Sequence, residues 1–361
     1  MPDGLSVLTG FPGFIGRRLV ARLLEDPQRR VVALVEPRMQ AAADQAVAEL
    51  GAGERVEVLG ADITDRRLGL DDDAYERLRA EASVVFHLAA IYDLAVPLEV
   101  AQRVNVDGTG NVLDFCASAE RLERLNYVST AYVAGLRRGV VYEHELALGQ
   151  AFKNNYESTK FQAEVWVRAA MDRVPSVIMR PAIVVGDSRT GETQKFDGPY
   201  YLLRTIAVLD RYGRAIPNFG RAQAPFNVVP VDFVVQTMVA AAGDERATGK
   251  TLHLVDPDPL SARELAATLS REYAGREPWG RMPASLLETT LRLAFVRRMF
   301  AGTPRESVRY LNHPVRFDTR GADDLLARHG LRCPRFVDYA PAIVRFFRDH
   351  QDDPRFLPAP G

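Results

Sequence analysis

The stretch that decides the fold is Thr9-Gly10-Phe11-Pro12-Gly13-Phe14-Ile15-Gly16. A short apolar run before it predicts a buried strand, and residues 17–25 continue it as a helical pattern. Glycines at such a junction let backbone N–H groups approach a pyrophosphate, and the amino terminus of the helix supplies a favourable dipole. The spacing departs from the usual Gly-x-Gly-x-x-Gly, so a tight turn that needs glycine for packing is the alternative. We expect residues 10–16 to bind the phosphates of a dinucleotide.

Short β-branched runs alternate with longer helical patterns along the first 180 residues. The expected strands are Ser6–Thr9, Val31–Val35, Val56–Leu59, Val84–Leu88, Leu125–Thr130 and Ser176–Met179. This alternation predicts parallel strands joined by right-handed helical crossovers. Because the runs are apolar throughout, helices should cover both faces of the sheet. We therefore expect an α/β fold with a doubly wound (Rossmann) parallel sheet.

The second half of the chain is more irregular and more helical. A loop-rich stretch over residues 186–198 indicates irregular chain near a site. It is followed by an expected strand, Thr251–Val255, and by expected helices at Val231–Ala242, Ser261–Tyr273, Pro283–Phe300 and Tyr339–His350. We expect a dinucleotide-binding domain over residues 1–180 and a smaller, mainly helical substrate lobe over 181–350, with some segments returning to the core. The Pro-rich tail, 351–361, is expected to fray.

Composition narrows the range of partners. A net charge of -1 argues against nucleic acid and anionic membrane, so the expected partner is a small molecule. No run approaches 18 uninterrupted apolar residues, which predicts no stable membrane insertion. Two distant cysteines and an amino terminus without an apolar leader predict a cytoplasmic protein. The six histidines show no metal-binding spacing, so we expect no metal site.

A second motif, Tyr156-Glu157-Ser158-Thr159-Lys160, sets a phenol and an ammonium four residues apart on one face of a predicted helix. Of the 46 basic residues only four are lysine, so the compact ammonium of Lys160 indicates a specific point-charge role. An ammonium beside a phenol favours phenolate. We therefore expect Lys160 to lower the pKa of Tyr156 and make it a proton donor and acceptor near neutral pH. Two ordinary solvent-facing side chains are the alternative.

Acidic residues end the second and third expected strands. Glu36 lies 20 residues beyond the last glycine of the first motif, where a carboxylate can accept hydrogen bonds from the adenosine ribose. This slightly favours NAD over NADP, although the nearby Arg38 and Arg17 are placed to bind a 2'-phosphate or to be solvated surface charges. Asp62 and Ile63 are expected at the adenine edge, with a turn or cap role for Asp62 as the alternative.

The order of these motifs resembles the extended short-chain dehydrogenase/reductase family, most of all its fatty acyl and thioester reductase branch. Further marks of the resemblance are His87-Leu88-Ala89-Ala90, Asn105–Thr109, Tyr127–Ala131 and Arg180–Val184. The resemblance implies that Lys160 binds the nicotinamide ribose. It also implies that cofactor contacts come from Ala89, Ala90, Pro181, Ala182, Ile183 and Val184.

The family supplies a hydroxyl that shares the substrate carbonyl with the tyrosine, and here Ser129 and Thr130 are both candidates for contact with the substrate. Counting back from Gly135, the resemblance implies that Thr130 takes the catalytic position. Asn105 is expected to tie strands and helix together, and His87 to be a hydrogen-bonded core residue. Sugar 4,6-dehydratases of the family carry Asp-Glu after the threonine, whereas this chain has Ala131-Tyr132, so dehydration is not expected.

We therefore expect an NAD(P)-dependent oxidoreductase that transfers hydride to an acyl thioester, aldehyde or hydrophobic ketone, with Tyr156 as proton donor. The thioester is expected on coenzyme A or a carrier protein, and a homodimer is a further expectation. The branch usually has a basic residue at the position of Glu36, so this chain departs from its pattern. Two alternatives stay open: a dehydrogenase or epimerase of a sugar-like or steroid-like alcohol, and a non-catalytic dinucleotide sensor. An apolar face within 283–300 is expected to line an acyl site, touch a membrane or belong to the core.

Overall fold

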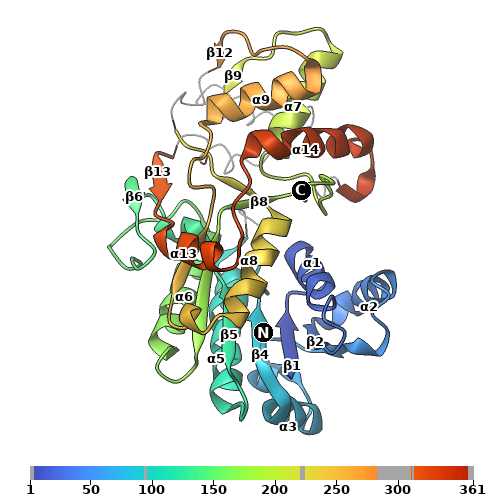
Figure 1. The fold of residues 1–361 in the computed structure, drawn as a ribbon, viewed down its shortest axis with the longest axis vertical. Coiled ribbons are helices and arrows are strands. Elements are labelled where there is room, and N and C mark those ends of the chain that lie inside the picture. Colours follow the sequence, from blue (N-terminus) through green and yellow to red (C-terminus); the bar gives the residue numbers. More distant parts are fainter. Residues whose placement is uncertain (1–3, 93–95, 220–223, 283–309, 311–312, 357–361) are drawn as a thin grey trace.

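The computed structural model of the 361-residue chain describes residues 4–92, 96–219, 224–282, 310 and 313–356 (Figure 1). Its centre is a seven-stranded parallel sheet with the order β11-β7-β5-β4-β1-β2-β3. The strands are β1 (Leu5–Thr9), β2 (Arg30–Val35), β3 (Val56–Gly60), β4 (Ala82–His87), β5 (Arg124–Val128), β7 (Ser176–Pro181) and β11 (Thr251–Leu254). The predicted doubly wound α/β fold is confirmed.

The strand order places a switch point beside β1. The chain runs outward from β1 through β2 to β3 and then returns to the other side of β1 as β4, where Thr9 pairs with His87. Connections on the two sides of β1 therefore leave in opposite directions. In open α/β sheets this creates a crevice outside the carboxyl ends of the strands, and ligands bind there.

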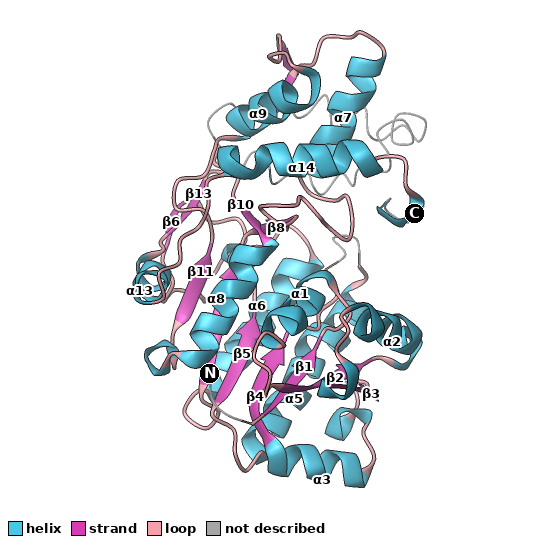
Figure 2. Ribbon diagram, turned by 45° about the vertical axis from the view of Figure 1, so that its right-hand side comes forward, coloured by secondary structure: helices cyan, strands magenta, loops and turns pink. Residues whose placement is uncertain are grey.

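Helices cover both faces of the sheet (Figure 2). On one face pack α1 (Phe14–Leu23), α2 (Gln40–Glu49), α8 (Val231–Gly243) and α13 (Arg320–Arg328). On the other face pack α3 (Asp72–Glu81), α5 (Gly108–Ser118) and α6 (Asn155–Ala170). Side chains along β1 alternate between the two faces because the strand is pleated. Leu8 belongs to the first hydrophobic cluster, on the α1 face, and Val7 belongs to the second, on the α6 face.

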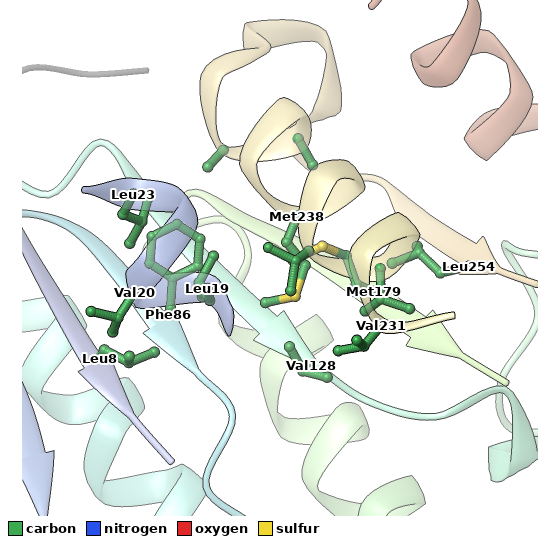
Figure 3. Close-up of a cluster of buried hydrophobic side chains, with 14 of the residues drawn as sticks. Leu8, Leu19, Val20, Leu23, Phe86, Val128, Met179, Val231, Met238 and Leu254 are labelled. Carbon is green, nitrogen blue, oxygen red and sulfur yellow. The ribbon is translucent and has the colours of Figure 1, made fainter. Parts of the chain in front are cut away.

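The first of these clusters lies beneath α1 and α8 (Figure 3). Leu19 of α1 and Met238 of α8 are fully buried there, together with Phe86 of β4. Each such side chain contributes roughly 1.5–3 kcal/mol by leaving water. The cluster therefore holds α1, which carries the glycine turn, firmly against the sheet.

A smaller helical lobe lies beyond the carboxyl ends of the sheet strands (Figure 1). It contains α7 (Tyr200–Arg211), α9 (Ala262–Ala274) and α14 (Phe336–His350), which share a separate core around Phe196, Leu203 and Phe347. Short parallel pairs accompany it: β8 (Ile183–Val185) with β10 (Val228–Pro230), β6 (Gly139–Val141) with β13 (Val315–Phe317), and β9 (Asn218–Phe219) with β12 (Arg281–Met282).

Several details differ from the sequence expectations. Strand β5 ends at Val128, because Thr130 accepts a hydrogen bond from Tyr132 N and caps the 3-10 turn η5 (Ala131–Ala134). The tail was expected to fray, but the Phe356 ring packs in a tilted arrangement against that of Phe196, with 5.2 Å between ring centroids. The Phe356 carbonyl oxygen also accepts the backbone N–H of Phe196 at 2.9 Å. The expected helix 283–300 lies outside the described residues. Among the helices that are described, none has the length and apolar character to cross a bilayer.

Candidate active site

The segments singled out from the sequence meet at one edge of the sheet, because parallel strands place all their carboxyl ends on the same side. Each follows the end of a strand: Gly10 after β1, Glu36 after β2, Asp62 after β3, Ala89 after β4, Thr130 after β5 and Ile183 after β7. Segments that follow adjacent strands of the sheet therefore lie next to one another. The sheet thus assembles one continuous row of candidate binding groups.

The glycine turn is a close contact between α1, β1 and the chain after β4. Gly10 has φ +91°, and a Cβ there would lie 2.9 Å from Ala89 N. A Cβ on Gly16 would lie 2.6 Å from the Gly10 carbonyl oxygen. Both positions therefore require glycine, and the backbone of Ala89 lies directly against the turn.

The start of α1 fits the pyrophosphate of a dinucleotide. Its N-cap, Gly13, makes no side-chain capping bond, and its first turn holds no acidic residue. The first backbone N–H groups of a helix have no intrahelical acceptor, so these donors are suited to an anion. Phe11 is buried, and Phe14 and Ile15 pack against the core, so the turn offers backbone rather than side chains to a ligand.

The irregular stretch 186–198 packs beside the glycine turn. Arg18 of α1 forms ion pairs with Asp187 at 3.3 Å and with Glu192 at 2.8 Å. Gln194 Nε2 donates to the carbonyl oxygen of Pro12 at 3.4 Å. This stretch therefore borders the expected phosphate site, in agreement with its loop-rich composition.

Thr130, just after β5, and Tyr156, in the first turn of α6, come together. The Thr130 side chain lies close enough to the Tyr156 phenol to lower the pKa of that phenol. Asn154 caps α6 by accepting from Glu157 N at 2.9 Å, which fixes the helical turn that carries Tyr156. Lys160, one turn later, is 2% exposed, so the alternative of a solvent-facing pair does not hold for it.

The expected effect of Lys160 on Tyr156 is wrong for this structure. Burial raises the pKa of Tyr156 to about 12, and the nearby Thr130 side chain only partly opposes this. Lys160 Nζ instead donates to the Val128 carbonyl oxygen at 2.8 Å and lies 4.5 Å from the centre of the Tyr127 ring. Burial also lowers the pKa of Lys160 to about 7, partly opposed by Glu164. Tyr156 is therefore a protonated acid at neutral pH.

Ser129, the other hydroxyl candidate, is engaged elsewhere. Its Oγ donates to Glu164 Oε2 at 2.6 Å. Glu164 also pairs with Arg180 at 2.6 Å, and both side chains are fully buried. This hydroxyl therefore belongs to a structural ion-pair network, which disfavours Ser129 as a substrate contact and leaves Thr130.

Two supporting roles are confirmed. Asn105 Nδ2 donates to Ile91 O at 3.1 Å and to Thr159 Oγ1 at 3.0 Å, so it ties the chain after β4 to α6. His87 is hydrogen-bonded to Thr9 at 2.8 Å and to Thr109 at 3.0 Å. Burial lowers the pKa of His87 to about 3, which keeps it neutral in the core.

The acidic residues at the ends of β2 and β3 differ in exposure and engagement. Glu36 pairs with Arg38 at 2.6 Å, and both side chains are well exposed. Asp62 Oδ1 accepts from Thr64 N at 2.8 Å, which is the turn role given as the alternative. The Ile63 carbonyl accepts a side-chain hydrogen bond from α5, so the chain after β3 is held in place.

The other expected contacts lie after β4 and β7. Ala90 immediately follows Ala89, and Pro181 is the last residue of β7. Ala182 N donates to Leu254 O at 3.1 Å, and Ile183 and Val184 continue as β8 beside β10.

Sequence reasoning missed the buried charged partners on α6. Lys153 pairs with Glu157 at 3.1 Å, and Glu164 pairs with Arg180 as described above. The i, i+4 spacing of Lys153 with Glu157, and of Lys160 with Glu164, was the available signal. Over the described residues, no group of three or more His, Cys, Asp or Glu side chains is arranged to hold a metal ion.

Comparisons with known proteins agree with this geometry. The model of the family described as Male sterility protein, an NAD-binding family, matches residues 8–238, well over half of the chain. A non-canonical nonribosomal peptide synthetase, FrzA of Cladobotryum sp, is 29% identical over 81% of this chain. The aldehyde reductase lnaA of Aspergillus flavus is 29% identical over 71% of this chain.

The chain spans 30% of the length of the first relative and 26% of the second. Among solved structures, the terminal R domain from the myxalamid PKS-NRPS biosynthetic pathway superimposes with a TM-score of 0.80 at 25% identity. That match covers 98% of this chain and 92% of the R domain.

Proposed function

The chain belongs to the Male sterility protein family, a branch of the extended short-chain dehydrogenases/reductases, and from this premise we propose that it reduces an acyl thioester or aldehyde. Its class is that of NAD(P)-dependent oxidoreductases. The observation that carries the proposal is the approach of the Thr130 side chain to the Tyr156 phenol at the carboxyl edge of the sheet. The likeness to an aldehyde reductase and to a terminal R domain supports this substrate class.

Thr130 and Tyr156 suit the stabilisation of a carbonyl oxygen. Their hydroxyl groups lie close to one another, so both can bind one substrate oxygen. When bound, the reduced nicotinamide supplies the hydride. As negative charge develops on the oxygen, Tyr156 donates the proton that its raised pKa retains at neutral pH.

Lys160 has a positioning part in this proposal. Its ammonium is held against the Val128 carbonyl, at the end of the strand that leads to Thr130. In that place it would bind ribose hydroxyls of the dinucleotide and orient the nicotinamide. The backbone of Gly10 to Gly16 would bind the pyrophosphate, with Ala89, Ala90 and residues 181–184 along the rest of the dinucleotide.

The proposal also covers the choice of cofactor, the carrier of the thioester and the oligomeric state. Glu36 favours NAD over NADP, since a 2'-phosphate would meet its carboxylate. The thioester would be carried by coenzyme A or by a carrier protein. A homodimer is part of the same proposal and is tested by the mass of the protein in solution.

A cofactor-oxidation assay tests the function. The purified chain is mixed with NADH or NADPH and with acyl-CoA thioesters, aldehydes, steroid ketones and nucleotide sugars in parallel. Turnover of thioesters or aldehydes is expected. Turnover confined to sugars or steroids would overturn the substrate class, and tight cofactor binding without any turnover would indicate a dinucleotide sensor.

A further inference from the structure

A buried charged cluster lies at the start of α6, immediately beside Tyr156. Lys153 and Glu157 form an ion pair at 3.1 Å, and their side chains are 2% and 0% exposed. Tyr310 donates its phenol O–H to Glu157 Oε1 at 2.8 Å. Asn154 Nδ2 donates to the same Tyr310 oxygen at 3.0 Å. The carboxylate is thus bonded by groups from two distant parts of the chain.

The same cluster reaches the segment that carries Thr130. Lys153 Nζ donates to the Gly135 carbonyl oxygen at 2.9 Å, at the end of the turn that Thr130 caps. Tyr132, in that turn, meets Tyr310 edge to face at 4.9 Å between ring centroids. Lys153 Nζ lies 5.5 Å from the ring centre of Tyr132 and 5.0 Å from that of Tyr310. The cluster therefore joins the Thr130 turn, the Tyr156 turn and Tyr310.

Stability alone gives no reason for such a cluster. Removing two charges from water costs several kcal/mol per ion, and well-packed apolar residues often serve a core as well or better. Gly135 shows how tightly the junction is defined, since it has φ +59° and a Cβ there would lie 2.2 Å from Ala151 O. A buried, fully bonded ion pair instead fixes a unique arrangement of the pieces that it joins.

We propose that Glu157, held by Lys153 and Tyr310, is a positioning residue that fixes the Tyr156 phenol beside Thr130. This inference rests on the proposed reduction. Glu157 directly follows Tyr156 in the first turn of α6, so any shift of its carboxylate moves the backbone that carries the phenol. Small displacements of a reacting group are costly, on the order of a hundredfold in rate for 1 Å.

The test compares Tyr310→Phe with a matched control, Tyr273→Phe. Both substitutions remove a phenol O–H that donates to a side-chain oxygen, and the control bond goes from Tyr273 to Gln351 at 3.0 Å in the helical lobe. The expected result for Tyr310→Phe is a fall in kcat of about tenfold to a hundredfold, with unchanged cofactor Kd and nearly unchanged KM. The control should keep wild-type kcat. Equal kcat values for the two variants would overturn the proposal.

A second measurement does not depend on turnover. Hydrogen exchange followed by mass spectrometry on a peptide covering residues 153–160 should show faster exchange in Tyr310→Phe and unchanged exchange in the control. Unchanged exchange in Tyr310→Phe would also overturn the positioning role. If the wild-type protein turns over none of the substrates, the proposed function is overturned. The hydrogen-exchange result would still decide whether the cluster fixes the start of α6.

The charge itself is tested with Glu157→Gln and with the double variant Glu157→Gln/Lys153→Met. The single variant leaves the Lys153 ammonium buried without its carboxylate, and we expect lower stability and lower kcat. The double variant removes both charges, so stability should recover while kcat stays low. Recovery of kcat together with stability would show a merely structural pair and overturn the proposal.

Discussion

The Thr130 hydroxyl and its neighbour Ser129 differ in what they bind, although they are adjacent. Thr130 lies beside the Tyr156 phenol, whereas Ser129 donates a hydrogen bond to Glu164. The difference follows from the end of β5, since successive residues of extended chain point to opposite sides. Removal of the two hydroxyls should therefore have different consequences.

We expect Thr130→Ala to lower kcat by about a hundredfold or more, because one of two hydrogen bonds to the developing oxyanion is lost. Thr130→Ser should recover much of the activity. Ser129→Ala is the matched control and should mainly lower stability, by about 1–3 kcal/mol, because buried Glu164 loses a donor. Steady-state kinetics and urea unfolding measure both effects. A larger loss of kcat in Ser129→Ala than in Thr130→Ala would reverse the assignment.

Cofactor choice is tested at Glu36. A carboxylate at the end of β2 disfavours a 2'-phosphate, so Glu36→Ala should shift the ratio of kcat/KM for NADH over NADPH toward NADPH. The shift should be modest, about threefold to fivefold, because the site is exposed and screened. Arg38→Ala should shift the ratio the other way by removing the ion-pair partner of Glu36. Unchanged ratios in both variants would mean that neither residue contacts the ribose.

At the scale of elements, the junction of β1 and α1 decides whether a dinucleotide fits. In Gly16→Ala the new methyl group would meet the Gly10 carbonyl oxygen at 2.6 Å and push α1 away from β1. We expect a loss of about 1–3 kcal/mol in the free energy of unfolding and weaker cofactor binding. Gly60→Ala at the end of β3 meets no atom within 4 Å and is the matched control. Urea unfolding and cofactor titration measure both, and equal behaviour of the two variants would contradict the account.

Elements that depend on local pattern were predictable from the sequence. The apolar runs correctly predicted the main strands of the sheet. Helices α8, α9 and α14 lie where the helical patterns in the sequence predicted them. The end of β5 was not predictable, because the capping hydrogen bond of Thr130 competes with strand pairing only once η5 has formed. The packing of Phe356 was missed for a similar reason. Its ring contacts Phe346, ten residues earlier, and also Phe196, more than 150 residues earlier, and only the fold brings these rings together.

The proximity of the candidate residues Thr130, Tyr156 and Lys160 was predictable from the sequence, but their electrostatics were not. Spacing placed Tyr156 and Lys160 on one helix, and the motif order placed Thr130 near them. The pKa of Tyr156 is raised mainly by burial, which cannot be read from a spacing. The role of Glu164 was hidden because its partner Arg180 lies on another element.

At the scale of the whole molecule, two buried histidines should make the fold sensitive to acid. Burial lowers the pKa values of His87 and His253 from 6.5 to about 3. Between these values the unfolded chain binds more protons than the folded one, so stability must fall as pH falls from 6.5 toward 3. Each histidine contributes at most about 1.4 kcal/mol per pH unit within that window.

Thermal unfolding measured from pH 7 to pH 4 tests this linkage. The melting temperature should decline with acid, and its slope should be shallower in His87→Asn and His253→Asn. His144→Gln replaces an exposed imidazole and should keep the wild-type slope. The slope rather than the absolute melting temperature is the readout, since the buried substitutions also remove hydrogen bonds. Parallel slopes in all four proteins would exclude these histidines as the source.

The division into a sheet domain and a helical lobe stays a prediction. Segments late in the chain, among them α8, β11 and α13, pack on the sheet, so the chain crosses between the two parts several times. Tyr310, also late in the chain, donates its phenol O–H to Glu157, which directly follows Tyr156. Activity should therefore depend on the whole chain rather than on residues 1–180.

The most direct measurement is single-turnover oxidation of the reduced cofactor by Tyr156→Phe, with a thioester or aldehyde that the wild-type protein turns over. The phenol is the one group in this account that gives a proton to the substrate. The account predicts a rate lowered by about a hundredfold to ten-thousandfold, with the cofactor Kd unchanged. A rate close to that of the wild-type protein would contradict it.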